Sequence, residues 1–271
     1  MRADAAGDAF VDWAGVRHAP AGAAPRIASL VPSLTELLFA LGHADRVVAR
    51  TGFCIHPRAA RGVPKVGGTK DPDLARLAAL APTHLLVNVD ENRREDVTAA
   101  REFVPHVIVT HPMGPDDNPR LHALLGAVFG QRREAAALSG DYERACADAR
   151  HTTHALPRER VLYLIWRAPW MTVARDTYVS ATLACVGWDT VPATSAVRYP
   201  AVADGDAAWR DAQRILLSTE PFAFRARDVA ALAARTGKPV HLVDGEWTSW
   251  YGARAGAGLR ALAAMRAALA A

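Results

Sequence analysis

The chain of 271 residues is 51% hydrophobic and 22% charged, which is typical of a folded globular protein and excludes extensive disorder. Its formal net charge is +4, but the densest basic pairs are followed directly by glutamate, which indicates solvated helix faces and argues against a nucleic-acid surface. No run of about 18 uncharged apolar residues occurs, so we expect no membrane span. Cys54, Cys146 and Cys185 are far apart in the sequence, which predicts neither a zinc site nor a disulfide framework.

Residues 1–25 are rich in alanine, glycine and proline and are predicted to form a flexible N-terminal tail. They contain Asp4, Asp8, Asp12 and Arg17 and lack the continuous apolar core of about 7–15 residues that a secretory signal requires. We therefore expect a cytoplasmic location. A periplasmic location is expected instead if the gene start is misplaced or a leader has been removed.

Short β-branched runs alternate with helical stretches in the first half of the chain. Residues 26–31 predict a buried strand, and Ser33 with Glu36 predicts a capping box for the helix that follows. Asp71 followed by Pro72 predicts the start of another helix, because proline in the first turn loses no needed hydrogen bond. Strands are further predicted at 46–50, 84–89 and 106–110, and a helix at 91–103.

A stretch from 131 to 155 contains no breaker except Gly140 and predicts one long helix. The alternation resumes after it, with strands predicted at 161–166, 215–218 and 239–243 and helices at 176–187, 226–235 and 252–270. This order predicts an α/β fold with two Rossmann-like lobes, each built on a parallel sheet. The predicted domains are an N-terminal lobe at 26–130, a linking backbone helix at 131–156 and a C-terminal lobe at 157–271.

The familiar catalytic motifs are missing from the sequence, so we expect that the chain is not an enzyme. Residues 67–70 read Gly-Gly-Thr-Lys, which reverses the order that a phosphate-binding loop requires, and no nucleophile elbow or zinc-binding helix motif occurs. Cys54 and His56 form the one candidate titratable pair. They leave open an alternative of another class, a cytoplasmic metallochaperone or enzyme that reuses the fold.

Aromatic residues gather after three predicted strands of the second half. Because parallel sheets bind ligands beyond the carboxyl ends of their strands, we expect these loops to form one apolar wall. The corresponding loops of the first half are smaller and more polar, and we expect them to form a polar wall. An apolar wall together with a polar wall suits a bulky, flat ligand with polar edges. The predicted ligand-binding residues are Pro32, Ser33, Phe53, His56, Gly68 and Thr69 in the first half and Trp166, Arg167, Trp170, Met171, Glu220, Phe222, Trp247, Trp250 and Tyr251 in the second.

Several stretches resemble cobalamin-type substrate-binding proteins of ABC importers, a group that includes the helical backbone metal receptors. The resemblance rests on residues 26–36 (RIASLVPSLTE), 66–74 (VGGTKDPDL), 88–96, 217–224 and 244–254 (DGEWTSWYGAR). It implies a ligand in a cleft between two lobes and a rigid helix that allows little hinge motion. We further expect a monomer without an intrinsic cofactor. The ligand it implies is a corrinoid, with vitamin B12 (cobalamin) first, or alternatively a ferric siderophore or haem.

The resemblance also bears on partners and on ligand contacts. His56 is a candidate axial ligand for the metal, and Arg50, Arg167 and Arg254 are candidates for the edges of an anionic siderophore. Docking to an ABC permease requires an acidic residue on each lobe. Ala75 stands where glutamate is expected in the first lobe, so we expect docking to be weakened while ligand binding survives. The second lobe offers Asp204, Asp206 and Asp211.

Overall fold

The structure is a computed structural model and describes residues 9–270. The chain divides into two compact units, each built on its own sheet. Unit 1 comprises the residues up to Pro112 together with Asp116–Asp141 and Tyr251–Arg254. Unit 2 comprises Met113–Pro115, Tyr142–Trp250 and the residues from Ala255 onward. Within the described range no helix is long and apolar enough to cross a membrane.

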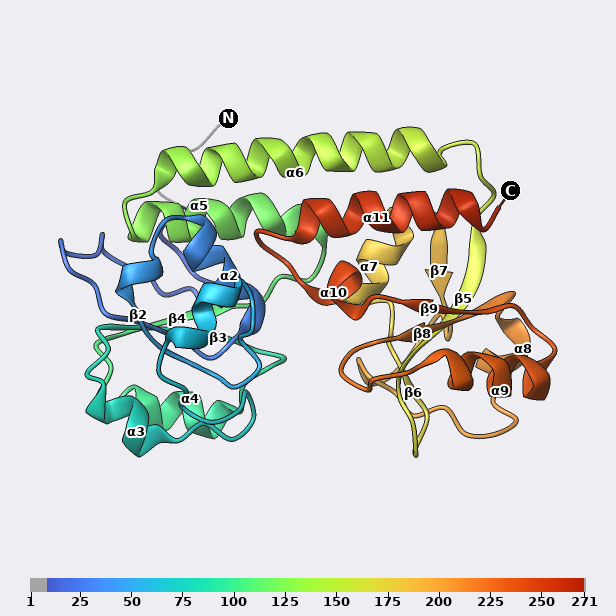
Figure 1. The fold of residues 1–271 in the computed structure, drawn as a ribbon, viewed down its shortest axis with the longest axis horizontal. Helices are drawn as coiled ribbons and strands as arrows, with labels where there is room; N and C mark the ends of the chain where they lie inside the picture. Colours follow the sequence, from blue (N-terminus) through green and yellow to red (C-terminus); the bar gives the residue numbers. More distant parts are fainter. Residues whose placement is uncertain (1–8, 271) are drawn as a thin grey trace. The chain divides into compact units, whose positions relative to one another are not determined.

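Unit 1 contains a four-stranded sheet in the order β2-β1-β3-β4, and every pair is parallel. The strands are β1 (Ile27–Ser29), β2 (Val47–Arg50), β3 (His84–Asn88) and β4 (His106–Thr110). Its helices include α2 (Pro32–Ala40), α3 (Leu74–Ala79), α4 (Arg94–Ala100) and α5 (Asn118–Val128). In Figure 1, α3 and α4 lie on one side of the sheet, where Leu77 and Ala100 pack against Leu85 and Val87. All four predicted strands of this half are confirmed.

Unit 2 contains a five-stranded sheet in the order β6-β5-β8-β9, with β7 also paired to β5. Only the β5–β6 pair is antiparallel. The strands are β5 (Glu159–Trp166), β6 (Met171–Thr172), β7 (Trp188–Thr190), β8 (Arg214–Ser218) and β9 (Val240–Val243). The predicted strands at 161–166, 215–218 and 239–243 are therefore confirmed, whereas β6 and β7 were not predicted because each has at most three residues.

Helices cover both faces of the unit 2 sheet, as Figure 1 shows. They are α7 (Tyr178–Ala184), α8 (Ala207–Asp211), α9 (Ala226–Thr236), α10 (Gly245–Ser249) and α11 (Ala255–Ala268). Val161 and Tyr163 contribute to the core shared with α7 and α11, while Leu162 and Leu164 contribute to the core on the opposite face with α8 and α9. This alternation places every second side chain of β5 on the same face. The prediction of an α/β fold with two mostly parallel sheets is confirmed.

Two segments differ from the predicted domains. The long helix is present as α6 (Arg132–Thr153), but the boundary between the units lies inside it, after Asp141. Of the predicted tail, residues 1–8 lie outside the described part. The rest is anchored, because the buried carboxylate of Asp12 pairs with His18 at 3.0 Å and accepts a hydrogen bond from the Val109 backbone N–H at 3.0 Å.

The predicted helix starts need correction. The capping box of Ser33 and Glu36 is wrong, because α2 begins one residue earlier with Pro32 in its first turn and Val31 as the preceding cap. The start at Asp71 and Pro72 is also wrong, since the carboxylate of Asp73 caps α3 by accepting from the Arg76 N–H at 2.9 Å. Other helices, such as α4 and α11, begin a few residues inside their predicted ranges.

Candidate functional site

The polar loops at the carboxyl edge of the unit 1 sheet are joined by Asn92. Its side-chain N–H groups donate to the carbonyl of Leu30 at 3.3 Å and to that of Thr69 at 2.9 Å. Its side-chain oxygen accepts from the Asn88 N–H at 2.9 Å. The loops that follow β1 and β3 and the loop around Thr69 are therefore held together by Asn92, which the sequence did not single out.

The predicted site residues of unit 1 differ in exposure. Phe53 is 63% exposed after β2, whereas His56, Thr69 and Pro32 are half-buried. Gly68 is buried, and a side chain there would collide with the carboxylate of Asp71. The hydroxyl of Ser33 is buried, and its hydrogen bond with Tyr251 opposes the rise that burial causes in the pKa of that phenol.

Cys54 lies beneath this surface. Its side chain is fully buried, and its Sγ lies 3.1 Å from the Thr35 hydroxyl and 3.2 Å from the Thr51 hydroxyl. Burial raises the pKa of the Cys54 thiol, although both hydroxyls act in the opposite direction. A buried thiol with a raised pKa is a poor nucleophile at neutral pH.

Two of the three aromatic loops of unit 2 meet. Trp166 contacts Phe222 edge-on at 5.6 Å between ring centroids, and Phe222 lies 4.6 Å from Phe224. Phe224 in turn stacks on Trp170 at 6.1 Å. Trp166 is 41% exposed, whereas Phe222 and Trp170 are half-buried and pack against the core beneath them. Met171, the first residue of β6, is half-buried.

The third aromatic loop is divided between the units. Trp250 is largely buried in unit 2, where its Nε1–H donates to the Glu220 carboxylate at 3.1 Å. Trp247 packs against the core of unit 2. Tyr251 belongs to unit 1, and its hydroxyl donates to the Glu91 carboxylate at 2.7 Å. Burial and the charge of Glu91 raise the pKa of Tyr251 well above its usual value.

Tyr251–Arg254 forms a segment, here called the strap, that other residues of unit 1 hold in place. The N–H of Gly252 donates to the side-chain oxygen of Asn118 at 2.7 Å. Arg254 pairs with Glu36 through two hydrogen bonds of 2.7 and 2.8 Å. The sequence suggested Arg254 for ligand contact and Glu36 for a helix cap, but it did not predict that they pair.

A buried hydroxyl network underlies the unit 2 loops. The hydroxyl of Tyr163, on β5, lies 2.9 Å from that of Ser218 and 2.6 Å from that of Thr248. Burial raises the pKa of Tyr163 to about 12. A Cβ atom at Gly245 would lie 2.7 Å from Cβ of Glu220, so the loops after β8 and β9 approach each other closely. Nothing around Tyr163 in the sequence distinguishes it from an ordinary strand tyrosine.

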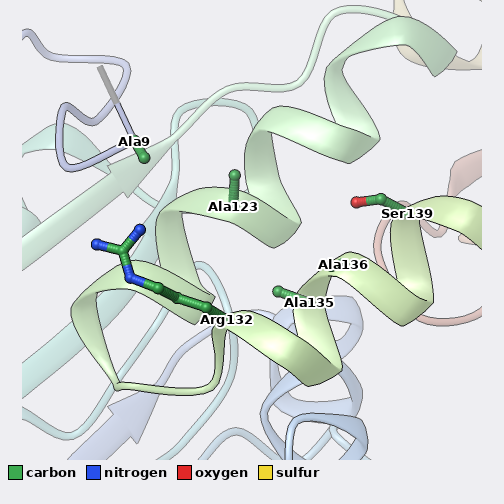
Figure 2. Close-up of a pocket in the computed structure, with 6 residues that line it drawn as sticks. All are labelled: Ala9, Ala123, Arg132, Ala135, Ala136 and Ser139. Carbon is green, nitrogen blue, oxygen red and sulfur yellow. The ribbon is translucent and has the colours of Figure 1, made fainter. Parts of the chain in front are cut away.

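A pocket in unit 1 involves none of the predicted site residues. Its volume is about 160 Å³. Figure 2 shows it between Ala123 of α5 and the first turns of α6. It is lined by Ala9, Ala123, Arg132, Ala135, Ala136 and Ser139. Apart from Arg132 and Ser139, the lining consists of alanine side chains, which present no polar side-chain group to a ligand. Within residues 9–270, no group of three or more His, Cys, Asp or Glu side chains is arranged to hold a metal ion.

Comparisons with known proteins identify a family and a fold. A family model described as periplasmic binding protein matches residues 27–235. A curated relative, the vitamin B12-binding protein of Pectobacterium atrosepticum, is 22% identical over 235 residues, which cover 84% of each chain.

Two solved structures share the fold. The periplasmic vitamin B12 binding protein BtuF of Vibrio cholerae has a TM-score of 0.77 at 20% identity, covering 91% of this chain and 97% of that one. The periplasmic heme-binding protein RhuT from Roseiflexus sp. RS-1 has a TM-score of 0.77 at 21% identity, covering 92% and 100%.

Proposed function

The chain belongs to the periplasmic binding protein family, and we propose that it binds a metal-chelate small molecule, with cobalamin or another corrinoid as the first candidate. The observation that carries this proposal is the aromatic cluster of Trp166, Phe222, Phe224 and Trp170 beyond the carboxyl end of β5 and β8. Aromatic side chains at this edge of a parallel sheet offer flat apolar surface to a flat ligand. Each Å² of apolar surface removed from water contributes about 25 cal/mol.

Individual residues are proposed to have different roles. Trp166 and Phe53, the most exposed aromatics of the predicted set, would contact apolar faces of the ligand. Ser33 and Thr69 would hydrogen-bond to its polar edges, and His56 would approach the metal. The remaining members of the proposed ligand-binding set are Pro32, Gly68, Arg167, Trp170, Met171, Glu220, Phe222, Trp247, Trp250 and Tyr251.

The test is isothermal titration of the full chain with cyanocobalamin, hydroxocobalamin and cobinamide. We expect one-to-one binding with a submicromolar Kd, and at least a tenfold loss in the Trp166→Ala variant because a large exposed aromatic surface is removed. Trp13→Ala is the matched control, since Trp13 lies in unit 1 beneath Arg120 and belongs to none of the proposed loops. Equal affinity in the wild type and Trp166→Ala would contradict the assignment of this aromatic.

Haem and ferric siderophores are the alternative ligands within the same class. Heme-binding RhuT shares the fold as closely as vitamin B12-binding BtuF does, with a TM-score of 0.77 for each. Titration with haem and with a ferric siderophore therefore belongs in the same experiment. Saturable binding of either, with no heat from any corrinoid, would replace the first candidate and keep the metal-chelate function.

The enzyme or metallochaperone alternative depends on Cys54. Because Cys54 is buried and its pKa is raised, we expect its thiol to react slowly with a thiol reagent at neutral pH in the folded chain. Fast reaction of Cys54 without unfolding would favour this alternative over a binding protein. The same thiol titration of the Cys54→Ser variant shows how much of the reaction comes from Cys54 and how much from the other two cysteines.

Delivery to an importer and the cellular compartment stay predictions. Ala75 is exposed on α3, at the position where an acidic residue was expected for permease docking. In unit 2, Asp206 caps α8 and Asp204 pairs with Arg235 at 2.9 Å, while Asp211 is exposed. We propose that ligand binding is independent of this docking surface, so that Ala75→Glu leaves the Kd for the ligand unchanged.

A further inference from the structure

Asn92 lies in the loop after β3, at the carboxyl edge of the unit 1 sheet, and its side chain is buried. Its amide nitrogen donates to two main-chain carbonyls, those of Leu30 and Thr69, and its amide oxygen accepts from the N–H of Asn88. Leu30 directly follows β1, and Asn88 is the last residue of β3. The orientation of the amide is fixed, because the flipped amide would place its oxygen against the two carbonyls.

Thr69 lies at the tip of a short turn formed by residues 67–72, here called the Thr69 turn. The turn is closed on itself, because the Gly68 N–H donates to the Asp71 carbonyl at 3.3 Å and its first and last residues form an isolated bridge. A turn closed in this way shifts as a unit. A hydrogen bond at its tip therefore sets the position of the whole turn relative to the sheet.

The tip of the Thr69 turn is tied to the loop after β3 by bonds of different exposure. The buried amide of Asn92 donates to the Thr69 carbonyl at 2.9 Å. The ammonium of Lys70, an exposed residue, donates to the Asp90 carbonyl at 2.6 Å. Water competes for the exposed bond but not for the buried one, so Asn92 is the stronger tether.

We propose that Asn92 is a positioning residue for ligand binding, which holds the Thr69 turn against the ends of β1 and β3. This inference rests on the proposed function, in which Thr69 hydrogen-bonds to a polar edge of the ligand. Asn92 acts through the turn and does not touch the ligand, because its amide is buried and already donates to two main-chain carbonyls. Without this amide a bound ligand would have to order the turn, which lowers affinity although every contact residue is still present.

The first test uses the free chain. Asn92→Leu keeps the size of the side chain and removes its hydrogen-bonding groups. We expect amide hydrogen exchange in residues 66–73 to become at least tenfold faster in this variant. Thr83→Val is the matched control, because the half-buried Thr83 hydroxyl joins the same two strands at their amino ends by accepting from the Arg26 N–H at 2.9 Å. This control is expected to leave exchange in residues 66–73 unchanged.

The second test measures affinity for cyanocobalamin, or for haem if haem is the chelate that the wild type binds. We expect Asn92→Leu to weaken binding about tenfold and Thr83→Val to weaken it less than about twofold. In a double-mutant cycle, Asn92→Leu and Thr69→Ala should be non-additive, because the second change removes the contact that the first one misplaces. Asn92→Leu and Trp166→Ala should be additive, since Trp166 belongs to a loop of unit 2.

Asn92→Asp provides a readout that lost stability alone would not produce. Its carboxylate would face the carbonyls of Leu30 and Thr69, which raises its pKa, whereas the protonated acid donates a hydrogen bond to one of them. Relative to the wild type at each pH, the affinity of this variant is expected to recover about threefold as the pH falls from about 8 to about 5. Asn92→Leu should show no such recovery. If Asn92→Leu does not fold, Asn92→Asp at the higher pH takes its place in the other comparisons.

The outcomes separate this inference from the proposed function. Unchanged hydrogen exchange in residues 66–73, or additive effects of Asn92→Leu and Thr69→Ala, would overturn the positioning role and leave metal-chelate binding standing. An equal loss of affinity in Thr83→Val would also overturn it, because general destabilisation would then explain both variants. Failure of every chelate to bind the wild type would overturn the proposed function, and the ligand-binding role of Asn92 with it.

Discussion

Tyr163→Phe removes a single buried hydroxyl that connects the end of β8 to α10. The Ser218 hydroxyl donates its hydrogen to the carbonyl of Glu220, and the Thr248 hydroxyl donates its hydrogen to the carbonyl of Gly245 at 2.9 Å. The single proton of the Tyr163 hydroxyl is therefore donated to one of two oxygens, that of Ser218 at 2.9 Å or that of Thr248 at 2.6 Å. Its loss leaves one of these oxygens without this donor and removes the polar contact of the other in a buried site.

The expected cost follows from this inventory. Losing a buried hydrogen bond while its partners stay buried costs roughly 1–3 kcal/mol, depending on how unsatisfied the partners become. Because Ser218 and Thr248 each keep another hydrogen bond, we expect a loss of about 1.5 kcal/mol in the free energy of unfolding, and no cavity larger than a hydroxyl. Ligand affinity should fall about threefold, since the loop that carries Glu220 loses one of its tethers.

Urea unfolding of the full chain, followed by tryptophan fluorescence, measures the stability change. Tyr199→Phe is the matched control, because Tyr199 is 37% exposed and loses the same atom at the surface. We expect that control to cost less than about 0.5 kcal/mol. Equal losses in the two variants would refute the argument that the hydroxyl of Tyr163 is a structural tether.

Two further predictions concern buried charge and protons. Glu159→Leu should lower the free energy of unfolding by about 3 kcal/mol in urea titrations, because it removes the carboxylate that pairs with the buried guanidinium of Arg266 and with that of Arg214, which lies 2.9 Å from Glu159. The control Asp189→Leu breaks a more exposed pair with Arg158 and should lower the free energy of unfolding by less than about 1 kcal/mol. Equal losses in the two variants would contradict this reasoning. Burial lowers the pKa of His84 and of His122 to about 4, so the unfolded chain binds more protons between that value and about 6.5. The free energy of unfolding should therefore be highest above about pH 6.5 and decrease as the pH drops toward 4. This decrease should be smaller in His122→Gln. A fall of the same size in that variant would exclude His122 as its cause.

The sequence predicted the sheets better than the helix starts. Strands such as β3 and β8 are continuous apolar runs because both faces of a parallel sheet are covered, and this pattern depends only on local sequence. Helix starts depend on which of several capping residues the tertiary structure selects. Asp71 and Asp73 both stand before α3, and only the geometry of the preceding loop decides that Asp73 is the cap.

The candidate site was predicted by position, and its polar partners were missed. Strand ends identify which loops reach the carboxyl edge of a sheet, so Trp166 and Phe222 were placed without a structure. Glu91 received no predicted role, because its partner Tyr251 is far away in the sequence. Pairs of this kind are formed by the return of the chain to unit 1 after Trp250, which no local pattern encodes.

Within unit 2 some aromatic side chains of the loops pack against the core and others are exposed to solvent, and the exposed fraction of each side chain distinguishes the two roles. Trp170 stacks on Phe224 and packs against the core, while Trp250 is largely enclosed and donates to Glu220. Replacing either one removes core contacts or a buried hydrogen bond as well as any ligand contact. Trp166 is the most exposed tryptophan of these loops and touches Phe222 only edge-on. Its loss therefore changes the surface offered to a ligand with the least change in packing, and a loss of affinity there reports on binding itself.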